Sequence, residues 1–580
     1  MLRQNSFLVT ISKPAKATQP DSPSVTHVKV DMQKPNSHYI VYEKSDNAGF
    51  HIFFGERKDG RQLDPSRPIN GTSIQYRPDR KEVEIVADEV GAEYLFYKED
   101  QNSILLSNRL DNLVKVNDRP NWSAIQCFLS FGYTLKSDTF FNDIKKTLPY
   151  EKISIDTYNL KLTKLLYSPK PTENTHTNEP EAVRLFSKRL SEILNDYEPM
   201  VLMMSAGWDS RTLLAPRNSP VTAAYTHGDL SSRETTIAKK LTGRVRKDHL
   251  FRDVQNLKID NELLNEIIEM NGHCLWPIWH VSSRIAASTY ALPITSGVIG
   301  ARIGGHNGFP SMGSRSQKII NSLHLINPKL ITREKIIRDL EGILKAPERF
   351  WFTSQGGHQL FQETRPKCNE ELQETLKEYL GSYGDFSFAI EKFNYDHVSR
   401  QYMMKQPSMA RGALGYYSPL SHPDLLDLAY SMPFKSRLHN TLSKKIIKTL
   451  NPDLLQFPMA ATLTKAKRPI WLQELSRIVR IVIERAAIAL NRNRPKLGWF
   501  NYEHLYHSNV LNEIVDSLHS KLWSQEQMKY VISRNPENGV DAGSTLDMLC
   551  KIKTVDYYLN LSSYDSTISS KSDQRYAHPE

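Results

Sequence analysis

The sequence predicts an α/β protein in two parts, the first built on antiparallel strands and the second on a parallel sheet. Between residues 38 and 116, short apolar runs alternate with turn-forming residues, a rhythm typical of antiparallel hairpins. After residue 200, strand-like runs alternate with helical stretches, as in residues 221–226 followed by residues 233–241. Such units predict parallel strands joined by right-handed crossovers, with a ligand at the carboxyl ends of the strands.

The composition describes an ordinary globular chain of 580 residues, long enough for more than one domain, with 39% hydrophobic and 24% charged residues. We find no nucleic-acid motif, no apolar run of about 18 residues and no secretory signal, so we expect no nucleic-acid partner, no membrane span and a cytoplasmic protein. The net charge of +11 suits an anionic substrate such as ATP, and equally a solvated surface. The four cysteines are scattered, which indicates neither a zinc site nor a disulfide framework.

The stretch that carries the most chemistry is residues 201–211, Val-Leu-Met-Met-Ser-Ala-Gly-Trp-Asp-Ser-Arg. A buried strand, a turn of small residues and a helix start leave backbone N–H groups that attract phosphate. Ser205 and Ser210 add hydroxyl donors. Asp209 and phosphate are both anions, so Asp209 makes sense if a divalent cation lies between them. On the pattern alone, an ordinary polar turn between a strand and a helix is an equally good interpretation.

This stretch resembles the Ser-Gly-Gly-x-Asp-Ser pyrophosphate loop of the ATP pyrophosphatases, especially of the asparagine synthetase group. Ala206 stands where the family has its first glycine. The resemblance implies an ATP site with Mg²⁺ (magnesium) at Asp209. The loop residues that it implies as ATP ligands are Ser205, Gly207, Asp209 and Ser210.

The family contributes further nucleotide contacts from the residue before the loop and from the end of the second strand. These positions correspond to Met204 and His227. For His227, an exposed turn position without a ligand is the alternative.

A second stretch, residues 296–305, resembles the family's second ATP loop, Ser-Gly-x-Gly-x-Asp-Glu-x-x-Gly-Gly. It matches at Ser296, Gly297 and Gly305, but the family's Asp and Glu fall on Ala301 and Arg302. Arg302 has two interpretations: it pairs directly with phosphate oxygens, as a guanidinium can, or it signals lost catalysis.

Residues 88–97, 106–110, 124–134 and 139–150 resemble the closing part of the glutaminase-type domain of asparagine synthetases. The resemblance implies an Ntn-hydrolase-like α/β sandwich, which in the family has an amino-terminal cysteine nucleophile. This chain has no cysteine at position 2, and its first, Cys127, falls in a helical pattern where a small core residue is expected. We therefore expect a degenerate glutaminase fold without its reaction.

Residues 443–448 resemble a lysine-bearing helix of the family, and a basic turn follows at residues 465–469. The resemblance implies that Lys465 stabilises the acyl-transfer transition state, with Lys467 as the close competitor. Without the resemblance, a solvated basic turn is favoured. Residues 472–492 are predicted to form a basic, apolar helix whose apolar side chains run round much of it, which favours core packing over membrane binding.

The predicted domains are a polar leader, a degenerate glutaminase-like domain, a linker, an ATP pyrophosphatase domain with helical additions, and a mobile tail. Their boundaries are 1–36, 37–167, 168–180, 181–567 and 568–580.

The resemblance implies ATP-dependent amide-bond formation through an acyl-adenylate, with ATP and Mg²⁺ as cofactors. The implied substrates are a small-molecule or peptide carboxylate and an amine that does not come from glutamine hydrolysed in this chain. The protein partner expected is either a second copy of this chain, in a homodimer, or another protein of a biosynthetic complex. The alternative function is that of a catalytically degenerate nucleotide-binding or scaffold protein in a biosynthetic complex.

Overall fold

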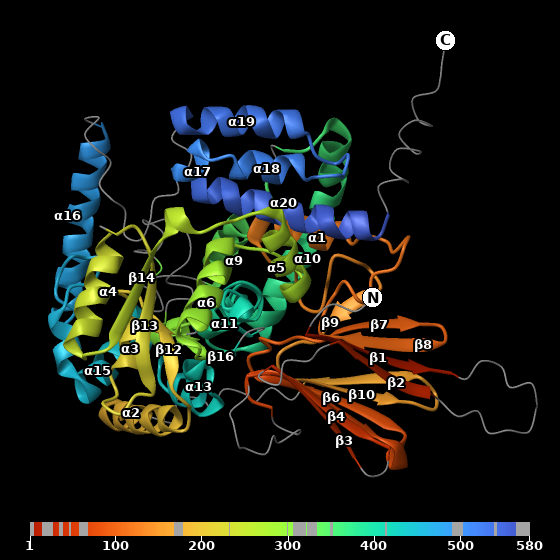
Figure 1. The fold of residues 1–580 in the computed structure, drawn as a ribbon, viewed down its shortest axis with the longest axis horizontal. Coiled ribbons are helices and arrows are strands. Elements are labelled where there is room, and N and C mark those ends of the chain that lie inside the picture. Colours follow the sequence, from red (N-terminus) through yellow and green to blue (C-terminus); the bar gives the residue numbers. More distant parts are fainter. Residues whose placement is uncertain are drawn as a thin grey trace, which may run out of the picture.

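An antiparallel β-sandwich forms one end of the molecule, a parallel sheet covered by helices forms the other, and further helices lie over both (Figure 1). The computed structural model describes residues 5–13, 27–33, 39–45, 48–56, 68–166, 178–230, 232–298, 300–305, 321, 333–348, 352–411, 414–489, 503–538 and 542–563. The predicted tail and most of the predicted linker lie outside these residues. An α/β fold with antiparallel strands first and a parallel sheet later is confirmed.

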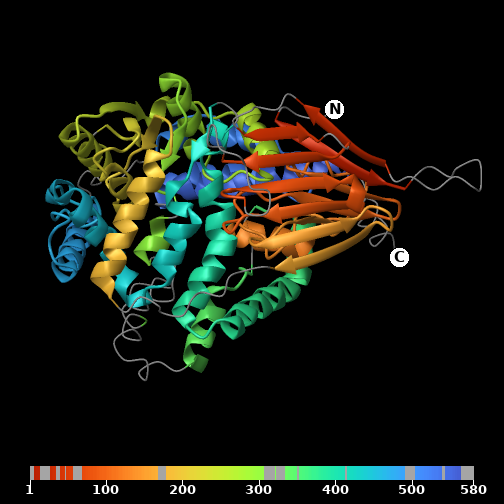
Figure 2. The ribbon, with the colours of Figure 1, turned by 90° about the horizontal axis from the view of Figure 1, so that it is seen from below.

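The sandwich has two sheets, in the orders β2-β1-β8-β7-β9 and β11-β10-β6-β5-β4-β3, and every neighbouring pair is antiparallel (Figure 2). Apolar side chains that alternate along the strands fill the space between the sheets. The strands are β1 (Ser6–Ser12), β2 (His27–Gln33), β3 (Ile40–Lys44), β4 (Phe50–Gly55), β5 (Gly71–Arg77), β6 (Glu82–Ala87), β7 (Phe96–Asp100), β8 (Ser103–Ser107), β9 (Ile144–Lys146), β10 (Glu151–Asp156) and β11 (Lys161–Leu166).

The prediction that residues 1–36 form a polar leader outside the folded domain is wrong for the described part of that segment. β1 pairs with β2 on one side and with β8 on the other. Phe7, Val9 and Ile11 are fully buried in the sandwich core. Their spacing of two places all three on one face of the strand, and burial of that face outweighs the polar, proline-bearing sequence around it.

The parallel sheet has the order β14-β13-β12-β15-β16, and all its neighbours are parallel. One hydrophobic cluster joins one face of the sheet to α2, α3, α4, α13 and α15, and a second joins the other face to α6 and α12. The strands are β12 (Met200–Met203), β13 (Val221–Gly228), β14 (Asp248–Asp253), β15 (Ile294–Ser296) and β16 (Tyr416–Tyr417). The helices are α2 (Glu179–Asn195), α3 (Trp208–Leu214), α4 (Arg233–Arg244), α6 (Pro277–Tyr290), α12 (Ser408–Arg411), α13 (Pro423–Tyr430) and α15 (Thr441–Leu450).

The other helices connect and cover the two sheet regions. One large cluster contains residues of α1, α5 and the carboxyl-terminal helices, and another joins α1 to α9, α10 and α11. These helices are α1 (Trp122–Phe131), α5 (Asn261–Asn271), α7 (Gly300–Gly304), α9 (Arg333–Ile343), α10 (Gln355–Ser382), α11 (Phe386–Asn394), α14 (Phe434–Arg437), α16 (Ile470–Ala489), α17 (His504–His507), α18 (Val510–Asp516), α19 (Gln525–Asn538) and α20 (Ala542–Leu561). None of the helices in the described part is long and apolar enough to cross a membrane.

The predicted core packing of the basic helix at residues 472–492 is also wrong. In both Figure 1 and Figure 2, α16 lies at the edge of the molecule opposite the sandwich. Many of its apolar side chains, Ile478 and Val482 among them, are exposed. The sequence shows an apolar helix but does not tell which side of it meets the protein.

Candidate functional site

The centre of the parallel sheet contains the point where the strand order reverses. β12 lies between β13 and β15, so the chain first builds outward on one side of β12 and later returns to build on the other. Parallel sheets bind their ligands at such a reversal, beyond the carboxyl ends of the strands. Residues 204–207 follow β12 at this edge and residues 297–298 follow β15, so the two predicted loops lie beside each other.

Hydrogen bonds within the first loop hold its turn closed. Ser210 Oγ donates to the Ser205 carbonyl at 3.0 Å and lies 2.9 Å from Ser205 Oγ. Ser205 Oγ also accepts the Gly207 N–H at 3.1 Å. The two serines predicted as phosphate ligands therefore shape the loop, with their hydroxyl groups next to each other.

Sequence reasoning missed Glu234, which lies in the first turn of α4 and contacts the loop. Its Oε2 accepts the Ala206 N–H at 2.5 Å. Burial raises the pKa of Glu234, although the Ala206 N–H and the nearby Arg211 oppose that rise. The Glu234 carboxylate thus accepts the hydrogen bond of the Ala206 N–H, one of the loop N–H groups that were predicted to face phosphate.

Arg211 is the second residue that sequence reasoning missed, although it ends the motif. It is fully buried, and its guanidinium donates to the carbonyls of Ala206, Leu454, Phe457 and Pro458. Burial lowers its pKa to about 10, which leaves it charged at neutral pH. Arg211 therefore ties the first loop to the segment at residues 454–458.

The predicted lysines lie on a turn that adjoins this segment. Lys465 forms an isolated β-bridge with Pro458, and the Lys467 N–H donates to the Leu455 carbonyl at 3.0 Å. Both lysine residues are exposed. The structure thus connects the basic turn to the first loop through Pro458 and Arg211, and both lysines are accessible from solvent.

The second loop packs directly on Asp209. A Cβ at Gly297 would lie 2.5 Å from the Asp209 Cβ, and a Cβ at Gly300 would overlap the Asp209 carboxyl group. Only glycine fits at these two positions, because any larger residue would push the loops apart. The residues following β12 and β15 therefore meet at the Asp209 side chain.

The Asp209 carboxylate fits a cation site. Its Oδ1 is buried and has no hydrogen-bond partner among the residues that the structure describes, and burial raises the pKa of Asp209 to about 7. An orphaned buried carboxylate oxygen is costly unless a proton or a cation joins it. The described chain contains no cluster of three or more His, Cys, Asp or Glu side chains placed to hold a metal. Asp209 would thus be a single protein ligand, which suits Mg²⁺ bound mainly by phosphates and water.

We predict that Gly297→Ala disrupts this loop contact. The new methyl group cannot coexist with the Asp209 Cβ at the present spacing, so the loops must separate, at a cost of roughly 1–3 kcal/mol in the free energy of unfolding. Urea unfolding of the purified protein measures this. Gly381→Ala is the matched control, because a Cβ there meets no atom within 4 Å. Equal stability of the two variants would contradict the contact.

The other predicted ATP ligands are already engaged by the protein. Met204 is buried; its N–H donates to the Tyr225 carbonyl at 2.8 Å, and its carbonyl accepts from Thr226 Oγ1. His227 is buried edge-to-face against Trp279, so the exposed-turn alternative is wrong. Burial lowers the pKa of His227 to about 3, so its ring is neutral.

Ser296, the first residue of the second motif, lies at the end of β15. Its Oγ is 2.9 Å from the Tyr416 hydroxyl and accepts the Val298 N–H at 3.3 Å. It therefore shapes the second loop in the way that Ser205 shapes the first.

Arg302 is fully buried, with its guanidinium against the Tyr395 ring and 5.2 Å from the centre of the Tyr430 ring. Its Nε, Nη1 and Nη2 find no hydrogen-bond acceptor in the described chain. The Arg302 carbonyl accepts from Arg437, which forms a buried ion pair with Glu391. The structure thus shows Arg302 stacked on aromatic rings and shows no contact between it and Asp209.

Cys127, in α1, offers no accessible thiol. Its side chain is buried, and the neighbouring Cys368 thiol together with burial raises its pKa, so the predicted core role is confirmed.

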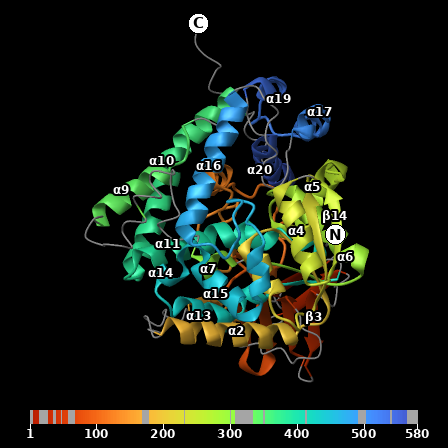
Figure 3. The same ribbon diagram turned by 90° about the vertical axis from the view of Figure 1, so that its left-hand side faces the viewer.

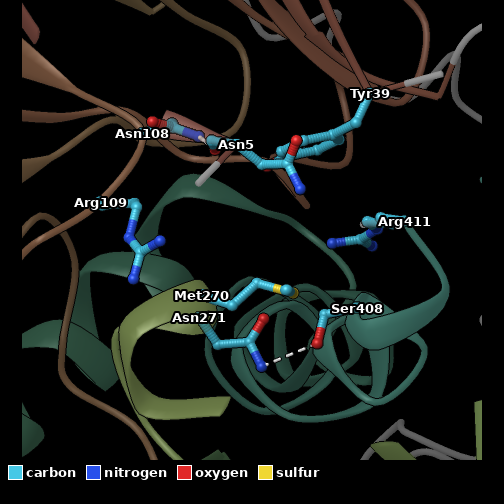
Figure 4. Close-up of a pocket in the computed structure, with 8 residues that line it drawn as sticks. All are labelled: Asn5, Tyr39, Asn108, Arg109, Met270, Asn271, Ser408 and Arg411. Atoms are coloured by element: carbon cyan, nitrogen blue, oxygen red, sulfur yellow. Dashed lines mark hydrogen bonds between the residues drawn. The ribbon is translucent and has the colours of Figure 1, made fainter. Parts of the chain in front are cut away.

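A cavity beside the start of β1 has a volume of about 20 Å³, room for about one water molecule (Figure 4). No cysteine lines it; its lining residues are Asn5, Tyr39, Asn108, Arg109, Met270, Asn271, Ser408 and Arg411.

No protein-family model matches this chain, and no curated protein matches it. The resemblance to the asparagine synthetase group therefore depends on the motif residues described above.

Proposed function

We propose that this protein is an ATP-dependent ligase that activates a carboxylate as an acyl-adenylate and transfers the acyl group to an amine. In this proposal the sandwich is a degenerate Ntn-hydrolase-like domain and the parallel sheet belongs to an ATP pyrophosphatase domain. The observation that supports it most is the meeting of the two glycine-bearing loops on Asp209, at the strand-order reversal between β12 and β15.

The first step needs a site that favours a leaving pyrophosphate. The substrate carboxylate attacks the α-phosphorus of ATP, and the bond from that phosphorus to the bridging oxygen of pyrophosphate breaks. The Ser205 hydroxyl keeps a proton that it can donate to a phosphate oxygen, while the Ser210 hydroxyl stays with the Ser205 carbonyl and the Ala206 N–H stays with Glu234. Mg²⁺, when bound, offsets negative charge on the departing pyrophosphate. Asp209 would hold it with a carboxylate oxygen that has no other partner.

The second step transfers the acyl group to the amine and releases AMP. A cation near the acyl group stabilises the negative charge that develops on its oxygen. Lys465 is accessible and lies on the turn that Pro458 and Arg211 connect to the first loop. In this proposal the chain does not hydrolyse glutamine, because Cys127 is buried. The nitrogen therefore comes from another amine.

Exchange of labelled pyrophosphate into ATP, measured with candidate acids, tests the first step, and amide formation tests the second. We expect Lys465→Ala to keep the exchange reaction but to lower amide formation by roughly 10²-fold or more, as for other electrostatic stabilisers of a transition state. Lys467→Ala, on the same exposed turn, is the matched control. No exchange with any acid, or amide formation unaffected by Lys465→Ala, would contradict the proposal.

A catalytically degenerate nucleotide-binding protein is the second candidate. Two observations favour it: Glu234 occupies the Ala206 N–H, and Arg302 stacks on Tyr395 where the family motif has a carboxylate. ATP binding without release of pyrophosphate or AMP, under every substrate condition tried, would identify this function.

A further inference from the structure

Helix α16 presents an apolar face to the outside of the molecule. Six large apolar side chains on it are at least half exposed, and their spacing puts them within one broad stripe of the helix. They are Trp471 (68% exposed), Leu475 (51%), Ile478 (56%), Val479 (50%), Val482 (60%) and Ile483 (62%). Figure 3 views the molecule from the side on which α16 lies in Figure 1, and there α16 faces the viewer.

Three polar side chains of α16 donate hydrogen bonds to the segment before the helix. Gln473 is buried and donates to the carbonyls of Ala466 and Arg468 at 3.1 and 2.9 Å. Arg480 donates to the Ala461 carbonyl at 2.9 Å, and Ser476 Oγ donates to the Thr462 carbonyl. The helix is therefore oriented against the usual rule, with hydrogen-bonding groups inward and its apolar stripe outward.

The segment around this stripe is strongly basic. Residues 461–489 contain six Lys or Arg and two Asp or Glu, a net charge of +4. Lys467 and Arg468 are exposed just before Trp471, at the start of the helix. An exposed apolar stripe with basic residues beside it and a tryptophan at one end matches helices that lie in the interface of an anionic bilayer.

We propose that the outer face of α16 docks this protein on an anionic membrane surface, with the apolar stripe in the interfacial region and the basic residues on lipid headgroups. A second copy of the chain fits this face poorly, because symmetric pairing would bring two segments of charge +4 together. The face is also a single convex helix, which inserts into a bilayer surface without needing a groove in a partner. This proposal does not rest on the ligase function.

Flotation of the full-length protein with vesicles tests the proposal. We expect the protein to float with vesicles that contain phosphatidylglycerol, to float less with phosphatidylcholine alone, and to be partly released by salt because headgroup attraction is screened. Ile478→Ser combined with Val482→Ser should lower the bound fraction by roughly tenfold or more, since two exposed apolar side chains leave the interface.

Val116→Ser combined with Leu165→Ser is the matched control, because these side chains are also exposed (65% and 62%) but lie far along the chain from α16. It should bind vesicles as the unchanged protein does, and both double variants should melt at the same temperature as that protein. Failure to float with any vesicle overturns the proposal. So does a dimer in sedimentation that only the α16 variant dissociates, since a second copy would then cover the face.

Discussion

Asp209→Asn is expected to abolish the exchange of pyrophosphate into ATP while making the ligand-free protein more stable at alkaline pH. The asparagine keeps the size of the side chain but lacks the charge that a hard cation needs, so the loss in exchange should reach roughly 10²-fold or more. The gain in stability has a separate cause. Oδ1 of Asp209 is buried without a partner among the described residues, and a neutral amide avoids the cost of burying a charge there.

The gain in stability should depend on pH in a defined direction. Burial raises the pKa of Asp209 from its ordinary value of 3.8 to about 7 in the folded protein. Between about pH 4 and pH 7 the folded state binds more protons at this group than the unfolded state, so the wild type loses stability as the pH rises. Asp209→Asn does not titrate, and its advantage should be absent near pH 4 and reach roughly 4 kcal/mol at pH 8.

Urea unfolding at several pH values without nucleotide measures this stability difference, and calorimetry with ATP, with and without Mg²⁺, measures the lost metal dependence. Asp79→Asn is the control, since its carboxylate is mostly exposed and should change neither property. If Asp209→Asn and the wild type show the same magnesium dependence, the loop is not a metal–pyrophosphate site. If the variant is less stable at pH 8, the Asp209 carboxylate has a partner that the structure does not show.

Arg437→Met is expected to destabilise the protein by about 3–5 kcal/mol, the cost of leaving a buried charge without its partner. Arg437 and Glu391 are almost completely buried and form two hydrogen bonds with each other, at 2.8 and 2.7 Å. Arg437 also donates to the Arg302 carbonyl and so holds α7, the helix that follows the second loop. Pyrophosphate exchange should therefore fall together with stability.

The double variant Glu391→Met with Arg437→Met separates the pair from the packing around it. Removing both charges leaves no buried ion, so most of the lost stability should return, although the bond to the Arg302 carbonyl stays lost. The exposed pair Arg184–Glu181 is the comparison, and Arg184→Met should leave the free energy of unfolding nearly unchanged, because water screens this pair. A double variant that is no more stable than Arg437→Met would show that Arg437 acts through packing rather than through charge.

Local patterns in the sequence determined the elements of the parallel sheet and the order of its motifs. Residues 221–226 lie within β13, residues 233–241 within α4 and residues 248–251 within β14. Each of these segments is bounded by local signals and has the apolar run or periodicity of its element, so the local sequence was sufficient. The residues of the two loops could be named for the same reason, because a glycine-rich turn after a buried strand is a local feature.

Only the tertiary structure decided which groups meet those loops and which faces are buried. Glu234, Pro458 and Gly297 come from three distant segments, and hydrogen bonds or close contacts bring each of them to the first loop or to Arg211. The same holds for β1, which is buried because β2 and β8 flank it, and for α16, whose polar side is bonded to the turn before it. A periodic pattern shows that a helix or strand has an apolar face, but the energy of burial depends on the surface opposite that face, which the rest of the fold supplies.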